Sequence, residues 1–410
     1  MFLTRNPGAG IASRRLSLIF AALVLTFAAA FAFTTIAASP ADASHHKNSK
    51  QAKKKAKKKK KKAKKKQQTH KVMTRNLYLG TDLTPAIEAP GFPEFIAENG
   101  QLLRNVDTND FATRSKGLSD EILSKSPDLI GLQEVALWRT GPTDLQAPLT
   151  GDYTASTVHV DFLDQLMDRL NKDGKRYRVV RVQDEFDFEA PADYDDNPAT
   201  GPLGGEINGR LTMRDAILKK VGAGIQVKST AGGNFETIYQ PVVSGVPINV
   251  DRGWVSANVK VGKAPRFRFV NTHLEAFGDP TIREAQAEEL VAKGGPMVTE
   301  DQPAILVGDL NSDDDTVKGD DRLAYNALKA AGLKDRGTQD PMSSRIKSSI
   351  LTDNFGAKAD FDHYIDHIMT NKKNRVKKLN ASVTGRTPAN GFWNSDHAGV
   401  FSKLRVKPKN

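Results

Sequence analysis

Short apolar runs alternate with segments of helical periodicity from residue 71 onward. Residues 72–78, 129–133 and 304–307 are apolar runs bounded by polar or turn residues, which is typical of buried strands. Residues 114–124 and 282–292 instead space their apolar side chains as an amphipathic helix does, and Pro127 follows the first of these segments as a helix stop. The pattern predicts alternating strands and helices in an α/β domain.

Further strands follow the same pattern, and Gly262 to Pro265 has the turn residues of a hairpin between two of them. Many short strands joined by hairpins, with a few helices between them, predict two packed β-sheets with helices on their outer faces. Residues 90–109, 140–158 and 184–209 are interpreted as loops, the last as an acidic surface insertion. The additional strands are predicted at residues 177–182, 216–220, 224–227, 254–261, 267–272, 365–370 and 398–404.

The first 43 residues have the features of a secretion signal peptide. Arg14 and Arg15 precede an apolar stretch over residues 16–38, and Ala41-Asp42-Ala43 supplies the small residues that a signal peptidase requires. An uncleaved membrane anchor is the alternative interpretation. We expect a secreted or cell-envelope protein, and the absence of cysteine is compatible with that expectation.

Residues 44–70 are interpreted as a disordered Lys-rich linker. Fourteen lysines lie between Lys47 and Lys66 with almost no apolar residue among them, so this segment cannot bury a core. Residues 1–70 contain 17 of the 60 Lys and Arg but one of the 48 Asp and Glu, so residues 71–410 carry a formal net charge of −4. The overall charge of +12 therefore belongs to the N-terminal segment, which could contact a polyanion or the cell envelope or act only as a spacer.

Polar residues that suit phosphate chemistry fall at the predicted strand ends. Any one of them could simply cap a turn. Together they provide hard oxygen donors for a cation and two histidines, which a metal-assisted attack of water on a phosphate requires. We expect Mg²⁺ as the cofactor, with Mn²⁺ or Ca²⁺ as alternatives. The candidates are Asn76, Glu134, His273, Asp309, Asn311, Asp366, Asp396 and His397.

Six short motifs resemble, in order, those of the endonuclease/exonuclease/phosphatase superfamily. This resemblance covers residues 71 to about 405 and implies a deoxyribonuclease I-like four-layer α/β sandwich, with residues 71–410 as the catalytic domain. The motifs are T-R-N at 74–76, L-Q-E at 132–134, N-T-H-L-E at 271–275, G-D-L-N-S at 308–312, I-D-H-I at 365–368 and S-D-H at 395–397.

The resemblance implies a metal-binding set and a water-activating pair. Asn76 and Glu134 match the family's metal residues, and Asp396 matches a second carboxylate near the metal. Asp309 matches the aspartate that orients or deprotonates the attacking water, and Asn311 matches the neighbouring amide that binds the phosphate.

The resemblance to this superfamily also implies roles for two histidines. His397 matches a histidine that acts either as general base or as transition-state stabiliser, and Asp366 matches the carboxylate that orients it. His273 matches a histidine that can protonate the leaving oxygen. Arg210 and Arg214 are further candidates for contact with the substrate phosphate, although a solvated strand flank is the preferred interpretation.

The expected function is that of a secreted, monomeric metal-dependent phosphodiesterase, with a nuclease as the first interpretation. A sphingomyelinase-like phospholipase C that binds a phospholipid head group is the alternative, and residues 235–250 could form its lipid-entering hairpin or a buried strand pair. A catalytically inactive protein that binds a phosphate ligand or surface polymer is the remaining interpretation. The absence of cysteine argues against inositol-polyphosphate 5-phosphatases, which usually carry a Trp-Cys-Asp-Arg stretch.

Overall fold

The computed structural model describes residues 51–55 and 68–408, except 198, 200–205, 314–320, 339, 342, 345–348, 353–360 and 373. The predicted signal peptide lies outside the described residues. The chain divides into two compact units, Met1–Lys59 and Lys60–Asn410. In the first unit, residues 51–55 are helical, which differs from the extended linker expected there; alanine and lysine both have high helix propensity. Within the described part of the chain, no helix is long and apolar enough to cross a membrane.

The second unit contains an eight-stranded sheet that begins slightly earlier in the sequence than expected. Strand β1 (Gln68–Asn76) starts four residues before the strand predicted at 72–78, because Gln68 to Lys71 pair with β18 (Gly399–Val406). β1 is parallel to β2 (Leu129–Gln133), whereas the other pairs in this sheet are antiparallel. The strand order is β17-β18-β1-β2-β6-β3-β4, with β5 also paired to β6. The remaining bounds are β3 Leu137–Pro142, β4 Thr157–Asp161, β5 Tyr177–Ala192, β6 Ile207–Lys220 and β17 Val376–Thr384.

A second sheet of six strands packs against the first. Its order is β13-β16-β12-β11-β10-β7, and it also contains one parallel pair, β11 with β12. Its strands are β7 Ile225–Asn234, β10 Gly253–Val261, β11 Phe267–His273, β12 Ala304–Asp309, β13 Lys334–Asp335 and β16 Asp366–Thr370. Two small hairpin-like pairs complete the described strands: β8 Val242–Val243 with β9 Val246–Pro247, and β14 Ser343–Ser344 with β15 Phe361–His363.

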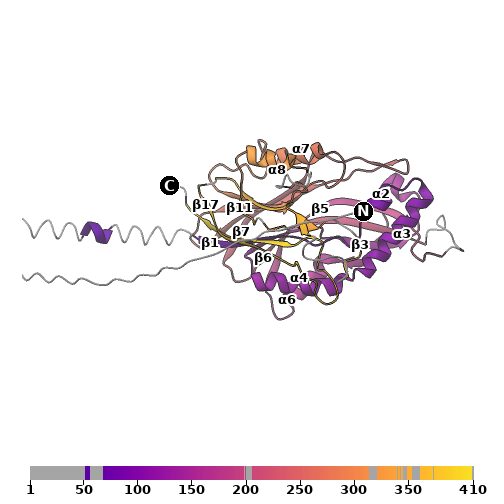
Figure 1. The fold of residues 1–410 in the computed structure, drawn as a ribbon, viewed down its shortest axis with the longest axis horizontal. Coiled ribbons are helices and arrows are strands. Elements are labelled where there is room, and N and C mark those ends of the chain that lie inside the picture. Colours follow the sequence, from indigo (N-terminus) through magenta and orange to yellow (C-terminus); the bar gives the residue numbers. More distant parts are fainter. Residues whose placement is uncertain are drawn as a thin grey trace, which may run out of the picture. The chain divides into compact units, whose positions relative to one another are not determined.

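Helices cover the outer face of each sheet, so the unit has four layers. Figure 1 shows α7 (Pro280–Val291) and α8 (Leu323–Ala330) on one side of the strands and α4 (Phe111–Lys125) and α6 (Phe162–Asn171) on the other. Apolar side chains from both sheets, including Val72, Val255 and Val307, form the core between them. The predicted four-layer α/β sandwich is therefore confirmed. The other helices are α2 Thr84–Ile87, α3 Phe92–Thr108 and α5 Ala147–Thr150.

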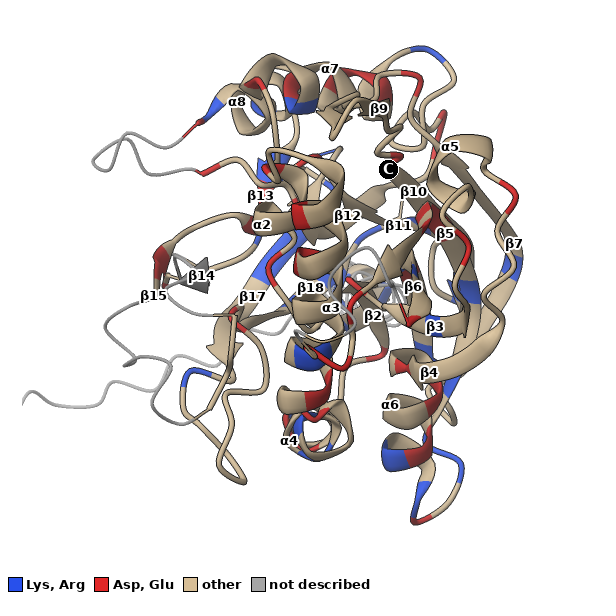
Figure 2. Ribbon diagram, turned by 90° about the vertical axis from the view of Figure 1, so that its right-hand side faces the viewer, with Lys and Arg blue, Asp and Glu red and all other residues tan. Residues whose placement is uncertain are grey.

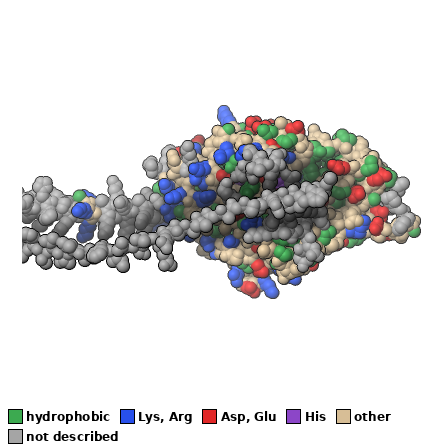
Figure 3. Space-filling model, viewed as in Figure 1, with side chains coloured by type: hydrophobic (Ala, Val, Ile, Leu, Met, Phe, Trp, Pro, Cys, Tyr) green, Lys and Arg blue, Asp and Glu red, His purple; other side chains and the backbone are tan. Residues whose placement is uncertain are grey.

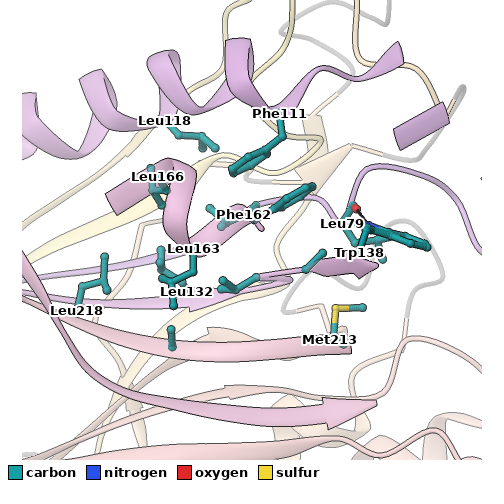
Figure 4. Close-up of a cluster of buried hydrophobic side chains, with 14 of the residues drawn as sticks. Leu79, Phe111, Leu118, Leu132, Trp138, Phe162, Leu163, Leu166, Met213 and Leu218 are labelled. Carbon is teal, nitrogen blue, oxygen red and sulfur yellow. Dashed lines mark hydrogen bonds between the residues drawn. The ribbon is translucent and has the colours of Figure 1, made fainter. Parts of the chain in front are cut away.

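The helix layer over the first sheet is held by apolar contacts. Phe111 of α4 stacks on Phe162 of α6 with ring centroids 3.6 Å apart, and Leu118 and Leu166 lie beside them (Figure 4). This pair faces Leu132 of β2, the strand whose end carries one of the predicted site residues. Burial of such side chains contributes about 1.5–3 kcal/mol each. The packing therefore fixes the strand from its outer face.

The predicted loops are partly wrong. Residues 92–108 form α3, which buries Phe95, Ile96, Leu102, Leu103 and Val106 on one helical face. Residues 140–158 contain the end of β3, the short helix α5 and the start of β4.

The acidic segment after residue 184 is also mostly regular structure. β5 continues to Ala192 and pairs with β6, which begins at Ile207. Asp187 forms ion pairs with Arg210 and Arg139, at 2.5 and 3.3 Å. Arginines on the neighbouring strands pair with Asp187, so the acidic composition did not indicate that the segment belongs to a sheet.

Close packing of the sheets requires glycine at position 131 of β2. A Cβ at this position would lie 2.2 Å from Asn271 Oδ1 and 2.4 Å from Val307 Cγ2. We expect Gly131→Ala to lower the free energy of unfolding by about 1–3 kcal/mol, because the opposing sheet would have to shift. Denaturant unfolding measures this change. Gly233→Ala is the matched control, since its Cβ would meet no atom closer than 3.8 Å; equal stability of the two variants would contradict the prediction.

Candidate active site

The two parallel strand pairs end at the same place. β1 and β2 end in register at Asn76 and Gln133, and β11 and β12 end in register at His273 and Asp309. The carboxyl ends of parallel strands lie at one edge of their sheet. A hydrogen bond of 3.0 Å from Asn76 Nδ2 to Asp309 Oδ2 joins the two edges. The sandwich therefore collects side chains from both sheets at this seam.

Asn76 connects the predicted metal residue to the predicted water-activating residue. Its Nδ2 also donates to Glu134 Oε1 at 2.8 Å, while its Oδ1 accepts from the backbone N–H of Tyr78 at 2.8 Å. The other oxygen of Glu134 accepts from the Leu79 backbone at 2.6 Å. The amide nitrogen of Asn76, and not its oxygen, therefore faces the two carboxylates.

Three residues around this network have left-handed backbone conformations. Their φ angles are 59° at Tyr78, 53° at Glu134 and 47° at Asn311. For residues other than glycine this costs of order 1–3 kcal/mol each, and such strain is concentrated at functional sites. The turns aim the Glu134 and Asn311 side chains toward the seam instead of continuing the strand direction.

His397 lies among three aspartates. Its Nδ1 is 2.7 Å from Asp366 Oδ2, and its Nε2 is 3.6 Å from Asp309 Oδ2 and 4.0 Å from Asp396 Oδ1. Asp366 reaches this position because it pairs directly with Asp309 in the β12–β16 ladder. Burial lowers the pKa of His397, but the charges of Asp366, Asp396 and Asp309 together raise it well above the ordinary value. The structure thus favours an imidazolium at this site.

Asp396 and Asp309 are buried carboxyl groups whose pKa values are raised. Burial is the main cause in both cases. The pKa of Asp396 rises to about 6, with Glu134 and Asp309 adding to the effect of burial and His397 opposing it. Such values are expected where several carboxylates share a small volume without a cation.

His273 has a different environment from His397. Arg252 Nη1 lies 3.1 Å from His273 Nδ1, and because a guanidinium can only donate, Nδ1 must accept and the ring proton must be on Nε2. Burial, then the charges of Arg252 and His397, lower the pKa of His273 well below its ordinary value. A neutral imidazole is a poor acid, and the proton-donor role that the resemblance implies for His273 stays a prediction. His273 Nε2 lies 3.7 Å from Asp309 Oδ2, which is too far for a hydrogen bond, and 3.2 Å from Asn311 Nδ2.

Asn311 is held beside both Asp309 and His273. Its backbone N–H donates to Asp309 Oδ1 at 2.9 Å, and its Nδ2 donates to the Leu274 carbonyl at 2.9 Å. All eight predicted site residues thus lie in or beside one connected network, although their individual chemical roles stay predictions.

The donor set suits a hard divalent cation. Glu134 and Asp396 supply carboxylate oxygens within electrostatic reach of each other, and Asn76 adds an amide that would have to present its oxygen to the ion. A bound cation would stabilise the ionised form of Asp396 and so lower its raised pKa. These residues therefore fit the metal that the sequence predicts.

Two buried arginines that were not predicted as site residues hold the loops in place. Arg75 donates to the backbone carbonyls of Asn76 and His397 and pairs with Glu121 at 3.2 Å. Arg114 of α4 donates to the carbonyls of Leu77, Tyr78, Asn109 and Asn394. The sequence contains a signal for both residues: Arg75 lies inside an apolar strand, and Arg114 lies on the apolar face of a helix. A buried charge at such a position must be matched by several hydrogen-bond partners.

The predicted phosphate-contacting arginines are already paired. Arg214 binds Asp161 at 2.6 Å and the Val135 carbonyl, and Arg210 binds Asp187. Both therefore act as structural links between strands.

Trp138 lines a mostly apolar cavity of about 90 Å³ with Arg252 and Phe277, and its ring N–H donates to the Leu79 carbonyl.

The chain resembles known proteins in its sequence and in its fold. A sequence profile described as the endonuclease/exonuclease/phosphatase family matches residues 98–397. No curated protein matches the sequence.

Similar solved structures include an endonuclease/exonuclease/phosphatase from Beutenbergia cavernae (18% identity, TM-score 0.49, 83% of this chain and 72% of that chain). A mannosyl-6-phosphatase from Bacteroides thetaiotaomicron has 16% identity and a TM-score of 0.48, covering 82% of this chain and 99% of that chain. Humanized D. rerio TDP2 has 16% identity and a TM-score of 0.43, covering 82% and 98%. At these identities the similarity concerns the fold alone.

Proposed function

Because the chain belongs to the endonuclease/exonuclease/phosphatase family, whose members hydrolyse phosphoester bonds, we propose that it is a secreted Mg²⁺-dependent phosphodiesterase that cleaves nucleic acid with an activated water. One observation carries this proposal: the Asn76 amide links Glu134 to Asp309, and Asp309 in turn lies beside the His397–Asp366 pair. A metal-binding set and a water-activating set are therefore parts of one network, as phosphoester hydrolysis requires.

Glu134, Asp396 and Asn76 would hold the Mg²⁺, with Mn²⁺ or Ca²⁺ as alternative ions. When bound, the ion would supply a Lewis acid for the phosphate oxygens. The charges of the two carboxylates match one divalent cation. The Leu79 backbone N–H donates to the Glu134 carboxylate and holds it in position before the ion binds.

Asp309 is the group that we assign to the attacking water. Burial first of all raises its pKa, which makes it a better proton acceptor near neutral pH. The His397 imidazolium places a positive charge 3.6 Å from Asp309 Oδ2, where negative charge on the phosphate would develop. His273 Nε2–H and Asn311 would orient the phosphate by hydrogen bonds.

The hairpin expected for a lipid-acting enzyme is buried instead. Val243 and Val246 of β8 and β9, with Ile248 and Val250, pack into an apolar cluster with Ala86 and Phe95. Val242 and Pro247 are the exposed members of the pair, and 69% of the Val242 surface is accessible. A membrane-entering hairpin needs its apolar side chains directed outward. This arrangement favours a nucleic acid over the sphingomyelinase alternative.

Charge on the domain surface is mixed. Figure 2 shows Lys and Arg interspersed with Asp and Glu over helices and loops, and Figure 3 shows more basic side chains toward the left of the visible face. Residues 71–410 are slightly acidic overall, so strong duplex binding would depend on added positive charge. We propose that the Lys-rich segment supplies it, or contacts a cell-envelope polyanion, after residues 1–43 direct export. A monomer suffices because every assigned residue comes from one chain.

The test presents residues 44–410 with duplex DNA, single-stranded DNA, sphingomyelin liposomes and small phosphoesters, each with Mg²⁺ and with EDTA. Glu134→Gln provides the inactive reference. We expect DNA cleavage that EDTA and the variant both abolish. Choline-phosphate release, or activity on phosphomonoesters alone, would refute the nuclease assignment while leaving phosphoester hydrolysis intact.

A further inference from the structure

A second group of buried ionisable residues lies beside the active site. Glu185 of β5, Asp215 of β6 and His273 of β11 each offer a ligand atom, and these atoms lie within 4.8 Å of one another. All three residues are buried. β5 and β6 belong to the first sheet and β11 to the second, so this cluster, like the catalytic network, connects the two sheets. None of the predicted metal residues belongs to it.

An irregularity in β5 turns Glu185 inward. Asp184 pairs with Arg214 and Asp187 pairs with Thr212, so two residues of β5 face one residue of β6 at this point and the register shifts. Asp184 is exposed, whereas Glu185 is only 5% exposed. β-bulges recur next to active sites because they redirect side chains. The backbone thus places a carboxylate in the interior that regular pairing would not require.

Three of the four carboxylate oxygens of this cluster lack a hydrogen-bond partner. Both oxygens of Glu185 and Oδ1 of Asp215 are buried without a hydrogen bond of good geometry. Asp215 Oδ2 accepts from Asn271 Nδ2 at 3.1 Å. An unpaired buried carboxylate costs several kcal/mol unless it is protonated or bound to a cation. Three unsatisfied oxygens in one place indicate a ligand with positive charge.

Arg252, whose charge acts on both carboxylates of this cluster, is already paired with another carboxylate. Arg252 Nε lies 3.5 Å from Glu275 Oε2, and both groups are buried. Because Arg252 is shared with Glu275, it offsets the charges of Glu185 and Asp215 only in part. Burial raises the pKa of Glu185 to about 8, against smaller opposing effects of the Arg252 charge and the Gly253 backbone N–H. In the absence of an ion, the cluster would therefore have to hold protons.

We propose that Glu185, Asp215 and His273 bind a second divalent cation of the transition-metal type, such as Mn²⁺ or Zn²⁺. Two carboxylates balance its charge, and a mixed oxygen and imidazole donor set suits these ions better than Mg²⁺. His273 Nδ1 is the nitrogen assigned to the ion, because Nε2 faces Asp309. Binding exchanges the Arg252 hydrogen bond at Nδ1 for a metal–nitrogen bond, while Arg252 keeps Glu275. The cation would fix the His273 ring and tie β5 and β6 to β11.

The experiment counts Mn²⁺ ions by titration, following the six-line EPR signal of the free ion. The wild-type chain is expected to bind two Mn²⁺, and Glu134→Gln one, because it removes only the catalytic-site ligand. Glu185→Gln should also bind one, and the double variant none. Asp184→Asn, one residue away and exposed, should bind two like the wild type. These counts require no enzyme activity, so they do not depend on the proposed substrate.

Two results would overturn the proposal. The first is complete loss of Mn²⁺ binding in Glu134→Gln alone, which would mean that the buried carboxylates hold protons instead. The second is an unchanged Mn²⁺ count in Glu185→Gln that is folded by circular dichroism. If Glu185→Gln does not fold, Asp215→Asn tests the same ligand set with a nearly isosteric change, and Glu134→Gln decides the question independently of both.

Discussion

Replacing Asp309 with asparagine is expected to lower kcat by about 10²–10⁴-fold on whichever phosphoester the enzyme cleaves. The amide keeps the size of the carboxylate but cannot accept the proton of the attacking water. It also removes the negative charge that lies 3.6 Å from His397 Nε2. Steady-state kinetics at saturating Mg²⁺, with KM determined separately, measures the loss.

The matched control for this variant is Asp152→Asn, which makes the same chemical change at an exposed loop position. Its kcat should equal that of the wild type. Circular dichroism should show both variants folded, since Asp309 is held by hydrogen bonds that an amide can partly retain. A kcat within threefold of the wild type for Asp309→Asn would remove Asp309 from the proposed mechanism.

The largest expected effect on stability comes from Arg75. Arg75→Met should lower the free energy of unfolding by about 3–5 kcal/mol, because it leaves the buried carboxylate of Glu121 without its charged partner. The carbonyls of Asn76 and His397 also lose their donor. Guanidinium unfolding followed by tryptophan fluorescence measures the change.

The matched control for Arg75→Met is Arg178→Met, which removes an arginine from the exposed face of β5. This control should change the free energy of unfolding by less than about 0.5 kcal/mol. A second comparison isolates the ion pair. Adding Glu121→Gln to Arg75→Met removes the stranded charge and should recover part of the loss. If the two single arginine variants have the same midpoint of unfolding, the Arg75 contacts do not stabilise the fold as described.

The strand ends were predictable from the sequence because their residues combine two independent signals. Asp309 and Asn311 follow an apolar run and belong to a short motif, so both the strand and the exposed polar pair could be inferred. The same reasoning located Asn76, Glu134 and His397. The motif order then indicated the four-layer fold, which the structure confirms.

Other parts depend on contacts that the sequence does not indicate. α3 was missed because Gly91, Pro93 and Gly100 have the composition of a loop, although its apolar residues share one helical face. Glu185 looked like one more acidic surface residue, and only the bulge between β5 and β6 turns it inward. The lowered pKa of His273 follows first from its burial and then from the charge of Arg252, which lies 21 residues away in the sequence but 3.1 Å away in space.

The seam between the two sheets also has a consequence for folding kinetics. The hydrogen bond from Asn76 to Asp309 spans 233 residues, and that from Arg75 to His397 spans 322. Contacts between residues so far apart in sequence slow folding, because the chain must close a long loop before they form. We therefore expect catalytic competence to appear late in refolding, once β18 has paired with β1.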